Sequence, residues 1–310
     1  MRTAIRRTLG ILWIADAVLQ VQPLMFTMDM VTNVMKPLLT HQPLWLLTLL
    51  TQAVNLFSAH LLLGNVLVAA IQMLVGLLLL FQPTARAGLM LSIIWGMGIW
   101  ILGEGMGGLL TGQASLFTGA PGSALLYVLW AMFLLHPWSQ VRDKARRLLE
   151  WGLATLFAAG AVMQSLPGWW TQPVLFSQID SNLTATTVPQ PHWVQVPILW
   201  IMAAVQQHPV QSNGVIIVIC ALLGVAWAMR WPARTLLATA SLIWLLAIWW
   251  VGEGFGMLFV GMATDPNTAP LIALGVLAVF MPSSRRTGQL GPGILPNSTP
   301  GPNSTKSPLR

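Results

Sequence analysis

The chain alternates long apolar runs with short polar segments from its first residues to about position 281. Eight of these runs approach or reach the length that a helix needs to cross a hydrocarbon core of roughly 30 Å. They cover residues 9–26, 64–81, 87–110, 121–135, 149–166, 214–229, 235–260 and 267–281. This pattern predicts an all-α, polytopic integral membrane protein with eight transmembrane helices.

Two further stretches, 43–62 and 191–209, are apolar but carry many polar groups. In the first, polar residues recur at roughly helical spacing, which predicts an amphipathic helix that lies on the membrane surface or lines a cavity. In the second, we expect Pro197 to break any such helix, because proline lacks the backbone N–H that a helix interior needs.

Charged residues make up 7% of the chain, against roughly 25% in soluble domains, and this excludes a soluble globular protein. The net charge of +7 does not indicate nucleic-acid binding, because the basic residues sit in small groups between apolar runs. Eight spans with both termini in the cytoplasm place every Lys and Arg except Lys36 on the cytoplasmic side. We therefore predict a multi-pass protein of the plasma membrane. Asp16 and Gln20 interrupt its first apolar run, which we interpret as an uncleaved span.

The sequence also repeats itself. The segment IIWGMGIWILGEGMGGLLTG (93–112) returns as LIWLLAIWWVGEGFGMLFVG (242–261). The repeat pairs Glu104 with Glu253, Trp95 with Trp244, Trp100 with Trp249, His60 with His208, Asn65 with Asn213, Gln20 with Gln164 and Pro121 with Pro270. We predict two parallel four-span repeats, 1–140 and 141–282, related by an axis along the membrane normal. The polar, Pro- and Gly-rich segment 283–310 is expected to be a disordered cytoplasmic tail.

Glu104 and Glu253 stand in the motif W-x2-G-E-G-x-G near the outer end of a predicted span. A carboxylate inside a span is costly unless it is protonated, paired or in contact with water, so both are candidates for binding a proton, an ion or a ligand. The alternative is that they accept hydrogen bonds from neighbouring helices, or from the indoles of Trp100 and Trp249, and hold the repeat together. The adjacent glycines weaken the helix, which predicts an unwound helix end facing an outer cavity.

Other polar residues join the two glutamates as candidates for ligand or proton binding. His60 and His208 precede Asn65 and Asn213 on the same outer side, where a His and a Glu from each half could form a metal or proton-linked site. Their spacing matches no recognised metal signature, and interfacial hydrogen bonding is the alternative. Asp16 has no acidic counterpart, since Gly160 takes its place in the repeat.

Two sulfur-bearing groups complete the candidates. Methionines crowd one outer loop, where their thioethers suit either Cu(I) or adaptable packing: Met25, Met28, Met30 and Met35. Cys220 lies inside an apolar run and is expected to pack as a small core residue.

The segments LGILWIADAVLQ (9–20) and NVLVAAIQMLVGLLLLFQPTARAG (65–88), with a looser counterpart at 213–234, resemble the DoxX-like group of small four-span bacterial membrane proteins. That group includes the membrane subunit of thiosulfate:quinone oxidoreductase. This sequence departs from the group by joining two units in one chain and by its GEG motif. The resemblance implies a redox or quinone-linked membrane context, and it carries over no catalytic residue.

Three functions remain open at this stage. The first is a membrane component of a redox system, working with other membrane subunits, in which an outer cavity holds a quinone, a haem or a metal ion and the glutamates manage protons. The second is a proton- or cation-coupled transporter with its site between the repeats. The third is a structural or assembly protein.

Overall fold

The computed structural model describes residues 1–184 and 187–281, and every regular element within them is a helix. This confirms the expectation of an all-α protein. The predicted disordered tail, 283–310, lies outside the described residues.

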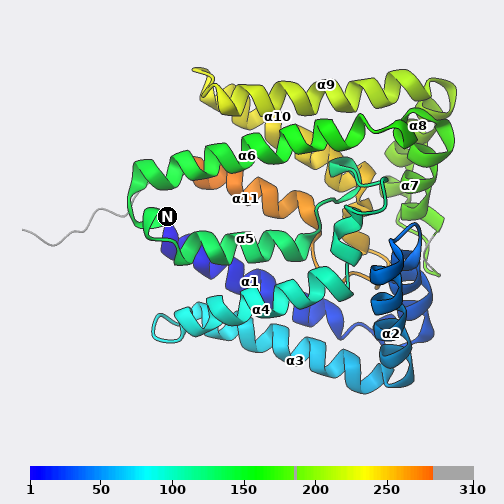
Figure 1. Cartoon of the computed structure of the whole chain (residues 1–310), viewed down its shortest axis with the longest axis horizontal. Helices are drawn as coiled ribbons and strands as arrows, with labels where there is room; N and C mark the ends of the chain where they lie inside the picture. Colours follow the sequence, from blue (N-terminus) through cyan, green and yellow to red (C-terminus); the bar gives the residue numbers. More distant parts are fainter. Residues whose placement is uncertain (185–186, 282–310) are drawn as a thin grey trace, which may run out of the picture.

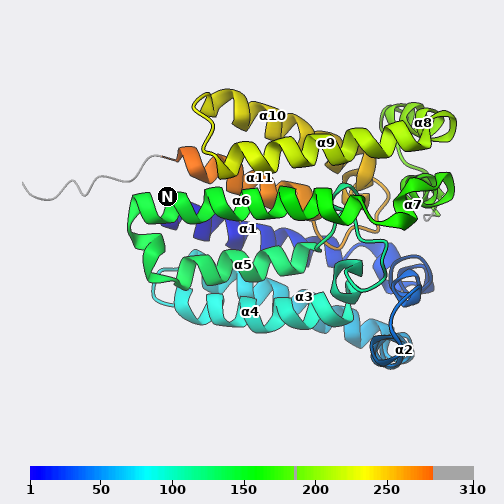
Figure 2. The same cartoon turned by 45° about the horizontal axis from the view of Figure 1, so that its top comes forward.

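Most of the helices run side by side along the molecule (Figures 1 and 2). They are α1 (Arg2–Gln20), α3 (Leu61–Leu80), α4 (Ala85–Leu102), α5 (Ser123–Leu135), α6 (Arg142–Gln164), α9 (Pro209–Ala228), α10 (Arg234–Ala247) and α11 (Thr268–Phe280). Three helices lie across one end of this bundle: α2 (Leu44–Ala59), α7 (Gln172–Thr184) and α8 (His192–Gln207). The N-terminus lies at the opposite end.

Short 3₁₀ or π turns connect these helices. They are η1 (Pro23–Phe26), η2 (Met30–Met35), η3 (Lys36–Leu39), η4 (Gly105–Gly108), η5 (Leu116–Thr118), η6 (Pro137–Gln140), η7 (Pro167–Trp170), η8 (Ile248–Gly252) and η9 (Gly254–Met257).

Four helical segments within the described residues are long and apolar enough to cross a membrane: Leu61–Leu80, Ala85–Leu102, Pro209–Ala228 and Arg234–Gly252. Large apolar side chains such as Leu62, Ile94 and Leu236 are exposed on the outside of these segments. Such an exposed apolar surface suits lipid contact, as expected of a protein embedded in a membrane.

Several predicted boundaries change. The runs 87–110 and 235–260 are not continuous helices, because helical structure stops at Leu102 and at Gly252, just before each GEG glutamate. Pro197 does not break α8, since it lies in the second turn, where it costs one hydrogen bond and the remaining turns hold the helix. Helix α7 lies in a segment for which the sequence pattern predicts no helix.

The lengthwise helices pair through buried amides. Gln20 at the end of α1 donates from Nε2 to the side-chain oxygen of Asn65 on α3, and Asn65 Nδ2 returns a bond of 2.8 Å to the Gln20 carbonyl. Gln164 on α6 and Asn213 on α9 repeat this exchange, with distances of 2.7 and 3.3 Å. All four side chains are buried, so each pair satisfies its own polar groups in an apolar setting. Asn65 and Asn213 therefore lock helix pairs together.

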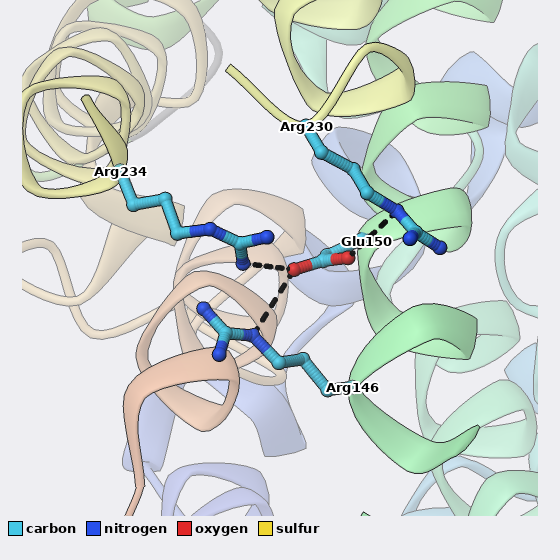
Figure 3. A network of polar contacts seen from close by, with 4 residues as sticks. All are labelled: Arg146, Glu150, Arg230 and Arg234. Atoms are coloured by element: carbon cyan, nitrogen blue, oxygen red, sulfur yellow. Dashed lines mark hydrogen bonds and ion pairs between the residues drawn. The ribbon is translucent and has the colours of Figure 1, made fainter. Parts of the chain in front are cut away.

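An ion-pair cluster lies at the end of the bundle opposite the transverse helices. Glu150 on α6 contacts Arg146 at 3.1 Å, Arg230 at 3.5 Å and also Arg234 (Figure 3). Because Glu150 is buried and the arginines are partly exposed, the cluster ties the start of α6 to the α9–α10 connection while keeping net positive charge at that end. Glu150 falls inside the predicted 149–166 span, and the sequence analysis did not single it out.

Candidate functional site

The backbone after each GEG glutamate winds in the left-handed direction. In Gly105–Gly108 the φ angles lie between 53° and 69°, and in Gly254–Met257 between 53° and 63°. Four consecutive residues in this conformation stop a right-handed helix, and the glycines make the turn accessible. The predicted unwound helix end is present at both motifs, whereas, in the described part of the chain, the predicted cavity beside it is found at Glu104 and not at Glu253.

Each glutamate caps the helix that follows its motif. Glu104 Oε1 accepts a hydrogen bond of 2.6 Å from the Ser123 hydroxyl and one of 3.0 Å from the Ala124 amide, at the start of α5. Glu253 accepts from the Ala269 amide at 3.2 and 3.3 Å, at the start of α11. A carboxylate there satisfies N–H groups that lack a partner within the helix and favours the positive end of the helix dipole.

The two tryptophans before the glutamates do not bind them, which corrects one expectation. Trp100 Nε1 donates to the Pro121 carbonyl at 2.8 Å, and Trp249 Nε1 donates to the Pro266 carbonyl at 2.8 Å. Pro266, not Pro270, therefore takes the position of Pro121. The connection after the second motif is shorter, because α11 begins at Thr268.

A cavity of about 520 Å³ opens beside Glu104, inside the first half of the chain (residues 1–140). Its walls come from α1, α3, α4 and α5, with α2 and η2 over its outer end, and most of its surface is apolar. Its volume lies within the range of roughly 300–1,000 Å³ typical of small-molecule sites. The polar groups that border it are Asp16, Gln20, His60, Gln72, Trp95, Glu104, Ser123, Tyr127, Thr264 and Asp265.

Three atoms of these polar groups are buried without a hydrogen bond in the described part of the chain: Gln72 Oε1, Trp95 Nε1 and Glu104 Oε2. The Tyr127 hydroxyl lies beside the Asp16 carboxyl, and the Tyr127 ring packs against Trp13 at 4.4 Å between centroids. Buried polar atoms are rarely left without partners in proteins. Donors and acceptors that border one cavity without partners indicate a place for a ligand or ordered water.

The structure divides the predicted candidates. Asp16, His60 and Glu104 border this cavity, and Asn65 does not, but it bonds Gln20, which does. Trp100 does not line the cavity, and neither do the second-half candidates Glu253, His208, Asn213 and Trp249.

Two of the four methionines of the outer loop, Met30 and Met35, also border the cavity. With Met25 they belong to a small core around Val54, whereas Met28 is exposed. Cys220 is buried and free, as a core residue should be.

Sequence reasoning missed Gln72, Tyr127 and Asp265 as site residues. Gln72 is a polar residue in the middle of an apolar run, and Tyr127 is the single tyrosine of the chain, so both carried a signal. Asp265 could not be assigned to this site, because it comes from the far half of the sequence.

No group of three or more His, Cys, Asp or Glu side chains in residues 1–184 and 187–281 is arranged to hold a metal ion. The chain matches no family model, and neither the curated proteins nor the solved structures include a detectable relative.

Proposed function

We propose that this chain is a membrane component of a redox system and that the cavity of its first half binds a quinone. The observation that carries the proposal is a largely apolar cavity bordered by several buried polar atoms that lack a partner, among them Gln72 Oε1, Trp95 Nε1 and Glu104 Oε2. When bound, a quinone supplies reversible uptake and release of electrons and protons.

The residues present fit the two ends of such a molecule. The indole N–H of Trp95 is a donor without a partner, the hydroxyl of Tyr127 lies beside the Asp16 carboxyl, and quinone carbonyl oxygens are acceptors. Asp16 and Glu104 are carboxyl groups that can exchange protons with the head group. Leu63 and Leu67 on α3 and Ile99 and Leu102 on α4 line the cavity, and they offer an apolar path for the tail.

The resemblance to the DoxX-like group gains support from the origin of these residues. Segment 9–20 contributes Trp13, Asp16 and Gln20 to the cavity, and segment 65–88 contributes Gln72. The two segments that carry the resemblance therefore supply much of the candidate site. We propose membership of this group on that basis.

We also propose eight spans in two parallel four-helix repeats in the plasma membrane, with both termini in the cytoplasm. The lengthwise course of α1, α3–α6 and α9–α11 supports the span number. The matching turns and amide pairs of the two halves support the repeat. The arginine cluster around Glu150, at the end away from the transverse helices, supports the orientation.

The test begins with protein purified in mild detergent. Solvent extraction should recover a quinone, and a short-chain ubiquinone should quench tryptophan fluorescence on binding, because Trp13 and Trp95 border the cavity. Asp16→Asn and Tyr127→Phe should each weaken this binding about tenfold, the effect of losing one buried hydrogen bond. Asp143→Asn, an exposed change on α6, is the matched control. Absence of both extracted quinone and specific binding would refute the proposal.

A second candidate is a proton- or cation-coupled transporter, and a separate observation favours it. Asp16, Glu104 and Asp265 border the same cavity, so three carboxyl groups face one space. This function predicts that Glu104→Gln abolishes coupled uptake into proteoliposomes while the protein stays folded. The third function, structural or assembly, gains support at Glu253 alone, because this residue caps α11 and does not border the cavity.

A further inference from the structure

The connection after the first GEG motif reaches into the second half of the chain (141–281). Ser115 donates to the side-chain oxygen of Gln164, and the Ala114 carbonyl accepts a bond of 3.2 Å from Trp169. Leu116 is buried against Gly160 on α6, so closely that a Cβ added to Gly160 would lie 2.7 Å from the Cδ2 atom of Leu116. The ring of Phe117 lies 5.8 Å from that of Trp244. Leu116 and Phe117 thus form an apolar plug between α6 and α10.

The connection after the second GEG motif makes the reverse crossing. Met262 and Ala263 are buried, and the next two residues, Thr264 and Asp265, border the cavity of the first half. The Asp265 carboxylate is held by its own loop, accepting from the Thr264 hydroxyl at 2.9 Å and from the Asn267 amide at 2.7 Å. The loop therefore presents a fixed carboxylate to a site built by the other half.

The repeat offsets show that these crossings are not equivalent. Leu116 and Asp265 lie in connections of unequal length, but Leu116 packs against Gly160 on α6, whereas Asp265 lies near Asp16 on α1. Asp16 corresponds to Gly160, and Gln72 corresponds to Cys220. In the first half, polar groups and a cavity lie next to the connection that follows the second GEG motif. In the second half, small or apolar residues pack closely against the connection that follows the first GEG motif, and Cys220 lies beside Trp244.

We infer that the described part of the chain has one outer ligand cavity, built by the first half and completed by Asp265 of the second half, and that the Leu116–Phe117 plug closes the equivalent space of the second half. The class of ligand, an amphiphile with a hydrogen-bonding head and a tail in lipid, rests on the proposed function. Which residues of each half build the cavity does not rest on that function, because it follows from the connections that cross between the halves.

Cysteine labelling tests the composition without a ligand, because Cys220 is the only cysteine of the chain. The wild type measures position 220, and Gln72→Cys in a Cys220→Ser background measures its counterpart. With N-ethylmaleimide on folded protein in detergent, the thiol of the Gln72→Cys variant should react at least tenfold faster than Cys220, which is completely buried. Phe117→Ala should then raise the Cys220 rate toward that of the Gln72→Cys variant. Equal rates at the two positions, or no increase after opening the plug, would overturn the inference.

Folding is checked in each variant by gel filtration and circular dichroism, and Leu116→Val provides a milder opening if Phe117→Ala does not fold.

The role of Asp265 is tested with a short-chain ubiquinone as the probe. Asp265→Asn should weaken its binding as much as Asp16→Asn does, and Asp180→Asn should not. If the labelling pattern holds and the quinone neither binds nor slows labelling of the Gln72→Cys variant, the proposed function fails while the single cavity stands. If the quinone binds and Asp265→Asn has no effect, the contribution of the second half is refuted.

Discussion

The side chain of Leu116 packs directly onto the backbone of Gly160, with no room for a Cβ between them. Asp265 and Asp16 also come from opposite halves and lie near each other, but they border a cavity of about 520 Å³. An apolar contact therefore fills one crossing between the halves, and two carboxyl groups border a cavity at the other. The two halves share a backbone plan at their GEG turns, yet only the first half has this cavity in the part of the chain that the structure describes.

The contact at Gly160 predicts an effect on stability. Gly160→Ala should lower the free energy of unfolding by about 1–3 kcal/mol, because the added methyl group has to displace Leu116. Gly152→Ala, in the same helix, has open space around its added Cβ and should be neutral or raise stability by about 0.5–1 kcal/mol. Thermal or denaturant unfolding in detergent measures both. Similar effects of the two changes would contradict the close packing at Gly160.

The left-handed turns predict a second pair of outcomes. Gly107 and Gly256 have nearly the same φ, 62° and 63°, so an alanine at either is strained. A Cβ on Gly107 would also lie 2.0 Å from the Pro121 carbonyl oxygen, whereas the nearest atom to a Cβ on Gly256 is 3.1 Å away. Gly107→Ala should therefore be the more destabilising change, with a loss of expression or a melting temperature lower than that of Gly256→Ala. The reverse order would contradict the close approach of Gly107 to the Pro121 carbonyl.

Capping by the glutamates gives a third prediction. Glu253→Ala should cost about 1–2 kcal/mol, because it removes the acceptor for the amide at the start of α11. Glu253→Gln keeps an acceptor oxygen and should recover part of this loss. Neither change should affect quinone binding, since Glu253 does not border the cavity. Glu104→Gln should instead weaken quinone binding. If only the Glu253 variants lost binding, the site would lie in the second half and not in the first.

Membrane orientation can be checked with single cysteines in a Cys220→Ser background. Thr40 precedes the transverse helix α2, and Gln82 lies in the α3–α4 connection at the opposite end of the bundle. Both are exposed. A membrane-impermeant thiol reagent added to intact cells should label Thr40→Cys and not Gln82→Cys, and permeabilisation should make the latter reactive. The opposite labelling would invert the proposed topology.

Much of the fold follows from local pattern. The apolar runs predict the long helices, and the glycines around Glu104 and Glu253 predict the unwound ends. Pro197 misled the prediction, because a proline near the start of a helix removes one hydrogen bond without preventing the following turns. Trp100 and Trp249 also misled it, since a residue one turn before a glutamate shares its helix face, and that proximity does not decide which acceptor the indole N–H reaches. Both find a proline carbonyl in the next connection.

The sequence alone determined that this is a helical membrane protein with paired glutamates, because hydropathy and periodicity depend on neighbouring residues and on a uniform apolar solvent. It also identified Asp16, His60 and Glu104 as candidates. Only the tertiary structure decided that these three border one cavity, that Glu253 caps a helix, and that Asp265 completes the site. The physical reason is that the connections after the GEG motifs cross between the halves, and contacts between residues so far apart depend on how the helices pack. No local pattern of apolar and polar residues encodes that crossing.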